Sequence, residues 1–517
     1  MSFGSRLLTF GLNVFIARRV DRRAYGIGFV SLELFNALGL FLSKEGFRRA
    51  SIRLLRDDRS EGKNSIIVCW SSMIVSTVIN LFLLGIWLSG QDSSQTPNYT
   101  VAVVLMFVAN ILEIVAEPLV LNEIIQKRLD SKPYVEGVAL TMRTFSLSLL
   151  SLGLGANFLL SFAAAQIVYS LTWISGFLFY ARQYGGIYDV VSSLTLPCSP
   201  LELVRTRKWK SLWLKEKRHG DLCQQMLIGA CQKMILGKGE NVILVALFDE
   251  AAWSSYALVS NFGSLILRTL FAPVEEIAFS YFSTADGSFE RRDRLHIARI
   301  LLGIQGALGA IALGYGPTYG YFALRLLYGR GWADDEDAVS AFQLYCVFLF
   351  AASLNGIMEA YAHATADVQW MRRNVFFQIA CSTVLCVASW TLRSYGARGL
   401  IVATTCSMAL RVVRCLFFLS PPLRWVHPRV PTLYASIFFS ALIAWGISSS
   451  CTDVMSSSND AEADLRPFLV RLAKEFAVAL TCLSMATIFR RSDLKALVSE
   501  LVSLKAVSDK PRKEKAQ

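Results

Sequence analysis

The chain has 517 residues, of which 54% are hydrophobic and 18% are charged, and its formal net charge is +13. Because about a quarter of the residues in soluble globular proteins are charged, this composition excludes an ordinary soluble domain and indicates many membrane spans. The Lys and Arg residues lie between the apolar runs, where cytosolic loops and anionic lipids favour them, so we expect no nucleic-acid partner.

Apolar segments separated by polar turns recur along the whole chain, and we predict a membrane span from each of them. Their expected bounds are 1–17, 24–43, 65–89, 100–121, 136–159, 161–182, 226–248, 253–282, 296–315, 341–365, 375–392, 399–420, 431–449 and 467–489. The predicted fold class is therefore an all-α polytopic membrane protein with about 14 transmembrane helices.

The spacing of these segments predicts how the chain is divided. The long basic segment 183–225 is expected to be a cytosolic linker between a lobe over 1–182 and a lobe over 226–420. A shift of 231 residues places Tyr25 over Tyr256 and Glu45 over Glu276, which predicts two pseudo-symmetric six-helix lobes. A chance match between apolar runs is the alternative. Two further spans fill 421–491, and 492–517 is expected to form a cytosolic amphipathic helix and tail.

Charge bias predicts the orientation. The basic loops follow even-numbered spans, and the acidic loops, such as 334–337, follow odd-numbered ones, so both termini are expected in the cytosol. The loop 18–23 disobeys this bias. Either the short first span is misplaced, or Arg18 and its neighbours form an anion-binding rim on the far side.

Chemistry at a catalytic or metal site is poorly supported. The eleven Cys residues include no C-x-x-C pair and lie mostly in or beside apolar spans, so we read them as buried apolar residues. The four His residues are scattered, and no nucleotide-binding or hydrolase motif occurs. We predict no catalytic residue, no cofactor and no metal ion, and we expect a protein that is not an enzyme.

The stretch 264–282 is apolar enough to enter a bilayer but contains Arg268, Glu275 and Glu276. Charges at this depth persist mainly where they face a protein interior or a water-filled cavity. Arg268 and Glu275 are seven residues apart, about two helical turns, so both could face one cavity. Pro273 would leave the Thr269 carbonyl without its usual donor. The alternative is a helix that surfaces near Pro273 and leaves the glutamates among lipid headgroups.

Other charges in or beside spans suggest two further roles. Glu113 and Glu117 share a helix face, where one could stay protonated or exchange a proton during transport; headgroup exposure is the alternative. Arginine forks match phosphate oxygens and stay charged when partly buried, and an amphiphile with a diphosphate head would suit them, although snorkelling to lipid phosphates is at least as simple. The residues in this second group are Arg48, Arg49, Arg143 and Arg268.

Several motifs together resemble a known family. They are Arg6 to Ile16, Lys44 to Ala50, Glu113 with Glu117 and Pro118, Lys233 with Gly239 and Glu240, Arg268 with Pro273 to Glu276, and Leu354 to Gly356 with Glu359. In this order they resemble the eukaryotic Rft family of oligosaccharidyl-lipid flippase-like proteins, over nearly the whole chain. The chain is shorter before Arg6 than is usual in that family.

The resemblance implies a fold of the multidrug/oligosaccharidyl-lipid/polysaccharide exporter superfamily. It also implies a role in N-glycosylation, where a dolichol-diphosphate heptasaccharide must cross the endoplasmic reticulum membrane, with membrane lipids and pathway proteins as further partners. In that role, Lys44, Arg48, Arg49, Arg143 and Arg268 would attract the diphosphate, and Glu45 and Glu276 would shape the switch between lobes. The alternatives are an ion-coupled exporter of small molecules that uses Glu113 and Glu117, and an assembly factor that transports nothing.

The C-terminal tail carries an address signal. Lys513 and Lys515 are the fifth and third residues from the end, as in the dilysine signal for retrieval to the endoplasmic reticulum. We therefore expect an endoplasmic reticulum membrane protein.

Overall fold

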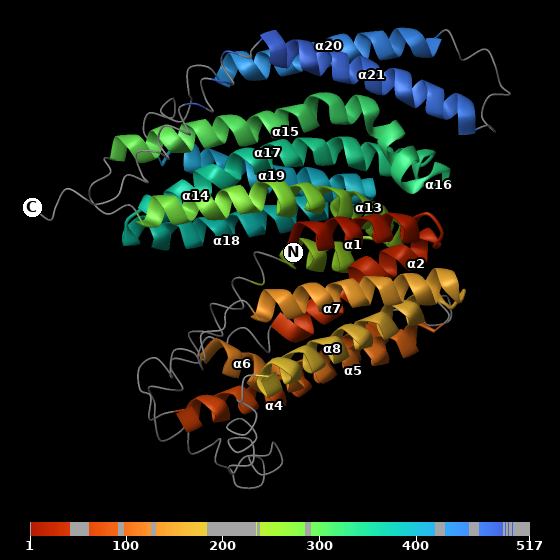
Figure 1. The fold of residues 1–517 in the computed structure, drawn as a ribbon, viewed down its shortest axis with the longest axis vertical. Helices are drawn as coiled ribbons and strands as arrows, with labels where there is room; N and C mark the ends of the chain where they lie inside the picture. Colours follow the sequence, from red (N-terminus) through yellow and green to blue (C-terminus); the bar gives the residue numbers. More distant parts are fainter. Residues whose placement is uncertain are drawn as a thin grey trace, which may run out of the picture. The chain divides into compact units, whose positions relative to one another are not determined.

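The computed structural model describes residues 2–41, 62–90, 98–125, 131–183, 234, 238–284, 291–418, 430–453, 465–489, 492, 495 and 499. All regular secondary structure in these ranges is helical (Figure 1). Ten helices within them are long and apolar enough to cross a membrane, which confirms an all-α polytopic membrane protein. The total of fourteen spans stays a prediction.

Several predicted span boundaries are wrong, and two of them have a clear physical cause. Instead of ending at Tyr315, α15 (Arg291–Tyr328) continues through Pro317 and is followed by α16 (Arg330–Ala333). Proline removes one backbone hydrogen bond, but Gln343 donates to the Pro317 carbonyl at 3.0 Å, and Leu324 and Tyr328 are buried beyond it. Packing against neighbouring helices thus allows α15 to continue beyond Pro317.

The second wrong boundary lies between the predicted spans 136–159 and 161–182. There α7 (Ser131–Ser148) continues as the π-helix η3 (Leu149–Gly153), and α8 (Phe158–Gln183) follows. The chain turns at Gly155, whose positive φ of 62° suits glycine, and Asn157 caps α8 by accepting from Leu159 N.

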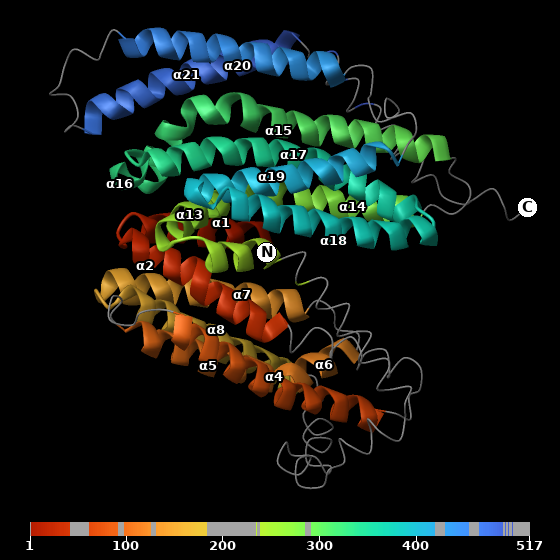
Figure 2. The same cartoon turned by 180° about the vertical axis from the view of Figure 1, so that it is seen from behind.

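The chain divides into two compact units, and the first covers Met1–Leu258. Its helices pack as a bundle in which α8 lies against both α5 and α7, while α1 packs on α7 and α4 on α5 (Figure 1 and Figure 2). Besides α7, η3 and α8, the elements are α1 (Ser2–Ala17), α2 (Arg22–Gly26), η1 (Ile27–Leu32), a helix over 33–41, α4 (Gly62–Gly90), α5 (Tyr99–Val115), α6 (Glu117–Ile125), a helix over 238–247 and the start of α13 (Glu250–Ile266).

Buried amides fix the register of three segments in this unit. Asn110 Nδ2 donates to Asn80 Oδ1 at 2.7 Å, and Asn80 Nδ2 donates to the Gly39 carbonyl at 3.2 Å. A Cβ at Gly39 would overlap both amides, so only glycine permits this approach.

The second unit covers Val259–Gln517, and α17 (Glu336–Thr365) is its central helix. It packs against α14, α15 and α19, whereas α20 and α21 lie side by side on the outer face of α15 (Figure 1 and Figure 2). The remaining elements are η4 (Leu267–Phe271), α14 (Ala272–Thr284), α18 (Val368–Thr391), η5 (Arg393–Tyr395), α19 (Gly396–Leu416), α20 (Val430–Asp453) and α21 (Leu465–Phe489).

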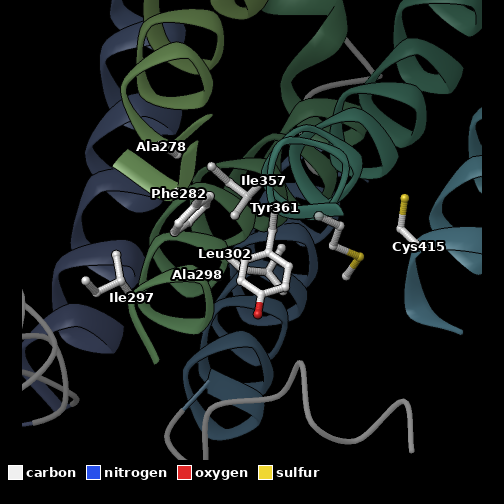
Figure 3. Packing of buried hydrophobic residues seen from close by; sticks show 9 residues of the cluster. Ala278, Phe282, Ile297, Ala298, Leu302, Ile357, Tyr361 and Cys415 are labelled. Atoms are coloured by element: carbon white, nitrogen blue, oxygen red, sulfur yellow. The ribbon is translucent and has the colours of Figure 1, made fainter. Parts of the chain in front are cut away.

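Apolar packing holds α14 on α17. Figure 3 shows Ala278 and Phe282 of α14 facing Ile357 and Tyr361 of α17, and the Phe282 and Tyr361 rings meet edge to face with centroids 5.3 Å apart. This buried cluster fixes which side of α14 faces the protein and therefore which side is left exposed.

Candidate functional site

The charged stretch predicted from the sequence is a helix with a widened turn. Residues 267–271 form the π-helix η4, in which the Ala272 N–H donates to the Leu267 carbonyl five residues back. Pro273 follows directly and has no N–H to give to Thr269. The sequence therefore correctly located the irregularity in the helix at Pro273. The helix continues through it with one widened turn and does not end there.

This π-turn changes which glutamate accompanies Arg268. Arg268, Ala272 and Glu276 are exposed, whereas Phe271, Ala278 and Phe282 are buried, and Glu275 is half-buried on that buried side. In an α-helix each residue advances by about 100°, so Arg268 and Glu275 would share a face; the π-turn adds about one residue and brings Glu276 there instead. Arg268 and Glu275 therefore do not share a helix face in the structure, and a cavity that both would line stays a prediction.

Glu275 points into the second unit. Gln305 Nε2 of α15 donates to its Oε1 at 2.9 Å, and the carboxylate occupies the space where Gly356 of α17 would carry a Cβ. Glu275 is thus bound by two neighbouring helices, and Arg268 and Glu276 are left on the exposed side of the stretch.

Arg143 of α7 already has a carboxylate partner. Its Nη2 lies 2.6 Å from Glu33 Oε2, and its guanidinium stacks over the Phe162 ring at 5.0 Å from the centroid. The side chains are 15% and 33% exposed respectively, so the pair is largely shielded from solvent. A phosphate would have to compete with Glu33 for this arginine.

Glu113 and Glu117 lie on two different helices. α5 ends at Val115, Ala116 forms a turn, and α6 begins at Glu117, because Pro118 cannot donate to the Ile114 carbonyl. The two residues are 5% and 3% exposed, so both face the protein interior of the first unit. This burial argues against the headgroup alternative.

The basic loop after α1 is organised by specific contacts. α1 ends at Ala17, close to the predicted end of the first span, and Arg18 is exposed in the following turn. Asp21 caps α2 by accepting from Ala24 N, and Arg23 forms an ion pair with Glu250 at the start of α13. Asp249 caps α13 in the same way, by accepting from Ala252 N.

An ion pair inside the second unit was not predicted. Arg411 Nη2 donates to both oxygens of Glu359, at 2.9 and 2.7 Å, and Asn355 and Gln378 donate to the same carboxylate at 2.6 and 3.1 Å. Both charges were visible within apolar spans. Their pairing was not, because 52 residues separate them and no local spacing rule joins α17 to α19.

Six predicted site residues lie outside the described residues. They are Lys44, Glu45, Arg48, Arg49, Lys513 and Lys515. Within the described ranges, no group of three or more His, Cys, Asp or Glu side chains could hold a metal ion.

A family model for the Rft protein matches residues 2–500. The chain belongs to the Rft protein family. Among Rft relatives, the mouse protein named Man(5)GlcNAc(2)-PP-dolichol translocation protein RFT1 is 25% identical over 429 residues, which cover 80% of this chain and 79% of the mouse chain. The Saccharomyces cerevisiae protein of the same name is 23% identical over 476 residues, which cover 80% of each chain.

Two solved structures share the fold of this Rft family member. The lipid II flippase MurJ, in an inward closed conformation, has a TM-score of 0.59 and 14% identity, with 95% of this chain and 98% of MurJ covered. An inward-facing multidrug resistance transporter of the MATE family has a TM-score of 0.50 and 11% identity, with 80% of this chain and 93% of that chain covered. The expected resemblance in family and fold is confirmed.

Proposed function

We propose that this Rft family member moves, or helps to move, a dolichol-diphosphate-linked heptasaccharide across the endoplasmic reticulum membrane for protein N-glycosylation. The names of the mouse and yeast relatives specify the seven-sugar dolichol diphosphate. The structural observation that carries the proposal is the exposed pair Arg268 and Glu276 within a helix of membrane-spanning length. A permanent cation at that depth suits a ligand with a membrane-embedded diphosphate.

The proposed architecture has fourteen spans, with two six-helix lobes over 1–182 and 226–420, the linker 183–225 and two further spans over 421–491. Both termini lie in the cytosol, where the tail 492–517 presents Lys513 and Lys515 for retrieval. The likeness to MurJ over 95% of the chain supports a fold of this kind. The protein moves its lipid without making or breaking covalent bonds.

The site residues divide into three proposed groups. Arg268, Arg18, Lys44, Arg48 and Arg49 attract the diphosphate, and Arg143 joins them when it leaves Glu33. Glu45 and Glu276 shape the switch between lobes, and Glu275 supports the stretch from within. Glu113 and Glu117 remain the candidates for coupling to an ion gradient.

Arg268→Ala tests the diphosphate contact. In cells that lack the native protein, we expect this variant to restore glycosylation of a reporter glycoprotein much less well than the unchanged chain. Arg268→Lys should restore it partly, because it keeps the charge but loses the fork. Arg372→Ala, an exposed arginine on α18, is the matched control and should restore it fully. Full restoration by Arg268→Ala would remove Arg268 from the site.

Reconstitution separates the proposed function from its alternatives. Purified protein in vesicles that contain a defined dolichol-diphosphate heptasaccharide should speed its transfer between leaflets. Transfer at the protein-free rate, together with lost glycosylation in cells without the protein, would indicate an assembly factor. Uptake of small molecules driven by a proton or sodium gradient would indicate an exporter.

A further inference from the structure

Glu275 occupies an unusual place for a carboxylate. It lies on the side of α14 that is otherwise lined by Phe271, Ala278 and Phe282, and this side packs into the second unit. A charged group on a buried helix face is costly, and well-packed apolar side chains usually stabilise such a face better. A buried carboxylate can instead make the structure more specific, because its hydrogen bond is formed in only one of several possible helix positions.

The contacts of Glu275 select one rotation of the helix. Gln305 donates to Oε1 at 2.9 Å, and the same oxygen fills the space left open by Gly356. If α14 rotated by one residue position, about 100°, the carboxylate would leave both neighbours. The π-turn η4 lies directly before α14, so the helix has an alternative register, namely an unbroken α-helix. In that register Glu275 would take the exposed place of Glu276, and Ile277, which is now exposed, would take the buried place of Ala278.

We propose that Glu275 is a positioning residue, seated between Gln305 and Gly356, that holds the π-turn register and so keeps Arg268 and Glu276 together on the exposed side. That this role serves binding of a diphosphate rests on the proposed function, whereas the positioning of the helix by Glu275 does not depend on it.

The surface that receives Glu275 is itself held in place. Asn355, next to Gly356, donates to Glu359 at 2.6 Å, and Arg411 of α19 binds both oxygens of that carboxylate. These bonds hold α17 against α19 next to Gly356, where the missing side chain leaves room for the Glu275 carboxylate. Gly356 and Gln305 keep their relative positions because α15 and α17 pack against each other.

The test measures the exposure of position 277 without any substrate. In the Ile277→Cys protein in detergent, we expect rapid labelling by a maleimide, above the labelling of the unchanged chain with its eleven cysteines, because Ile277 is 71% exposed. Adding Gly356→Ala should slow this labelling several-fold, because the new methyl group displaces the Glu275 carboxylate from its seat. Adding Glu275→Ala should slow it similarly, since the hydrogen bond to Gln305 is lost.

Three variants control the result. Glu275→Gln keeps the shape and can still pair with Gln305, so its labelling should match the Ile277→Cys parent. Gly446→Ala adds a methyl group to α20 where no atom lies within 4 Å, and it should also change nothing. Gly356→Ala combined with Glu275→Ala should label like Glu275→Ala alone, because the overlap is gone.

Labelling of both the Glu275→Ala and Gly356→Ala proteins at the parent rate would overturn the positioning role. If Gly356→Ala fails to fold, Glu275→Ala still decides, because it adds no atoms. The diphosphate contact of Arg268 and the positioning role of Glu275 are tested by different measurements. Full glycosylation with Arg268→Ala would rule out the diphosphate contact, but it would not affect the labelling result on which the positioning role depends.

Discussion

Glu359 and Arg411 neutralise each other inside the second unit, whereas Arg268 and Glu276 are exposed. This distinction decides which charges can serve a ligand and which ones support the fold. Two amides complete the hydrogen bonding of Glu359, so its carboxylate is fully occupied by Asn355, Gln378 and Arg411. We assign the pair a supporting role for this reason.

Removing one partner of this pair should destabilise the protein strongly. Arg411→Ala leaves the Glu359 carboxylate without its cation, and breaking a largely buried pair in this way costs about 3 kcal/mol. We expect a clearly lower melting temperature in detergent. Arg411→Ala combined with Glu359→Gln should recover much of the loss, because the unpaired charge is gone. Equal melting temperatures for the single and double variants would contradict the assignment.

The sequence identified the charges at membrane depth but not their partners. Arg268, Glu275 and Arg143 were recognisable because each interrupts an apolar run. That Arg143 binds Glu33, and that Glu275 binds Gln305, depends on contacts 110 and 30 residues apart in the chain. Local periodicity carries no information on such pairs.

Among the helices, the irregular turns determine which residues are presented. η4 lies before Pro273, and its effect on Arg268 and Glu276 is a rotation that a straight-helix wheel cannot reproduce. The existence of most spans follows from hydropathy alone. The widened turn, the continuation of α15 past Pro317 and the break at Ala116 depend on how neighbouring helices satisfy the backbone.

The crossing of α2 and α13 depends on Gly26. A Cβ at this position would lie 2.8 Å from the Ser254 backbone nitrogen, and a backbone atom of a packed helix cannot easily move. Gly26→Ala should therefore move α2 away from α13 and lower the melting temperature. Gly11→Ala is the matched control, because no atom lies within 4 Å of its Cβ position. A melting temperature that rises with Gly26→Ala, as helix propensity alone would predict, would show that the helices can adjust.

At the scale of the whole molecule, composition and hydropathy sufficed for the class of protein, and the motifs sufficed for the family. The predicted orientation rests on charge bias between loops, and one loop, 18–23, carries the wrong sign for its predicted side. The structure supplies a local reason why that loop is tolerated in the folded protein, since Arg23 is paired with Glu250 and Asp21 caps the following helix.

The Arg23 and Glu250 pair has a consequence for biosynthesis. The two residues are 227 positions apart, so the ribosome releases the arginines long before their counter-charge exists. In the proposed orientation, the first hairpin must enter the membrane against the charge bias and wait for the eighth span.

Nascent chains that stop before Glu250 should therefore place this hairpin the wrong way round more often than complete chains. A glycosylation acceptor site added in front of Met1 would report the inverted fraction. The complete chain with Glu250→Gln separates the effect of the counter-charge from that of length. Equal inverted fractions in all three proteins would mean that orientation is fixed before the pair forms. If the fractions differ as expected, synthesis of Glu250 corrects the orientation of the first hairpin. The step most prone to error would then be membrane insertion, before the protein folds.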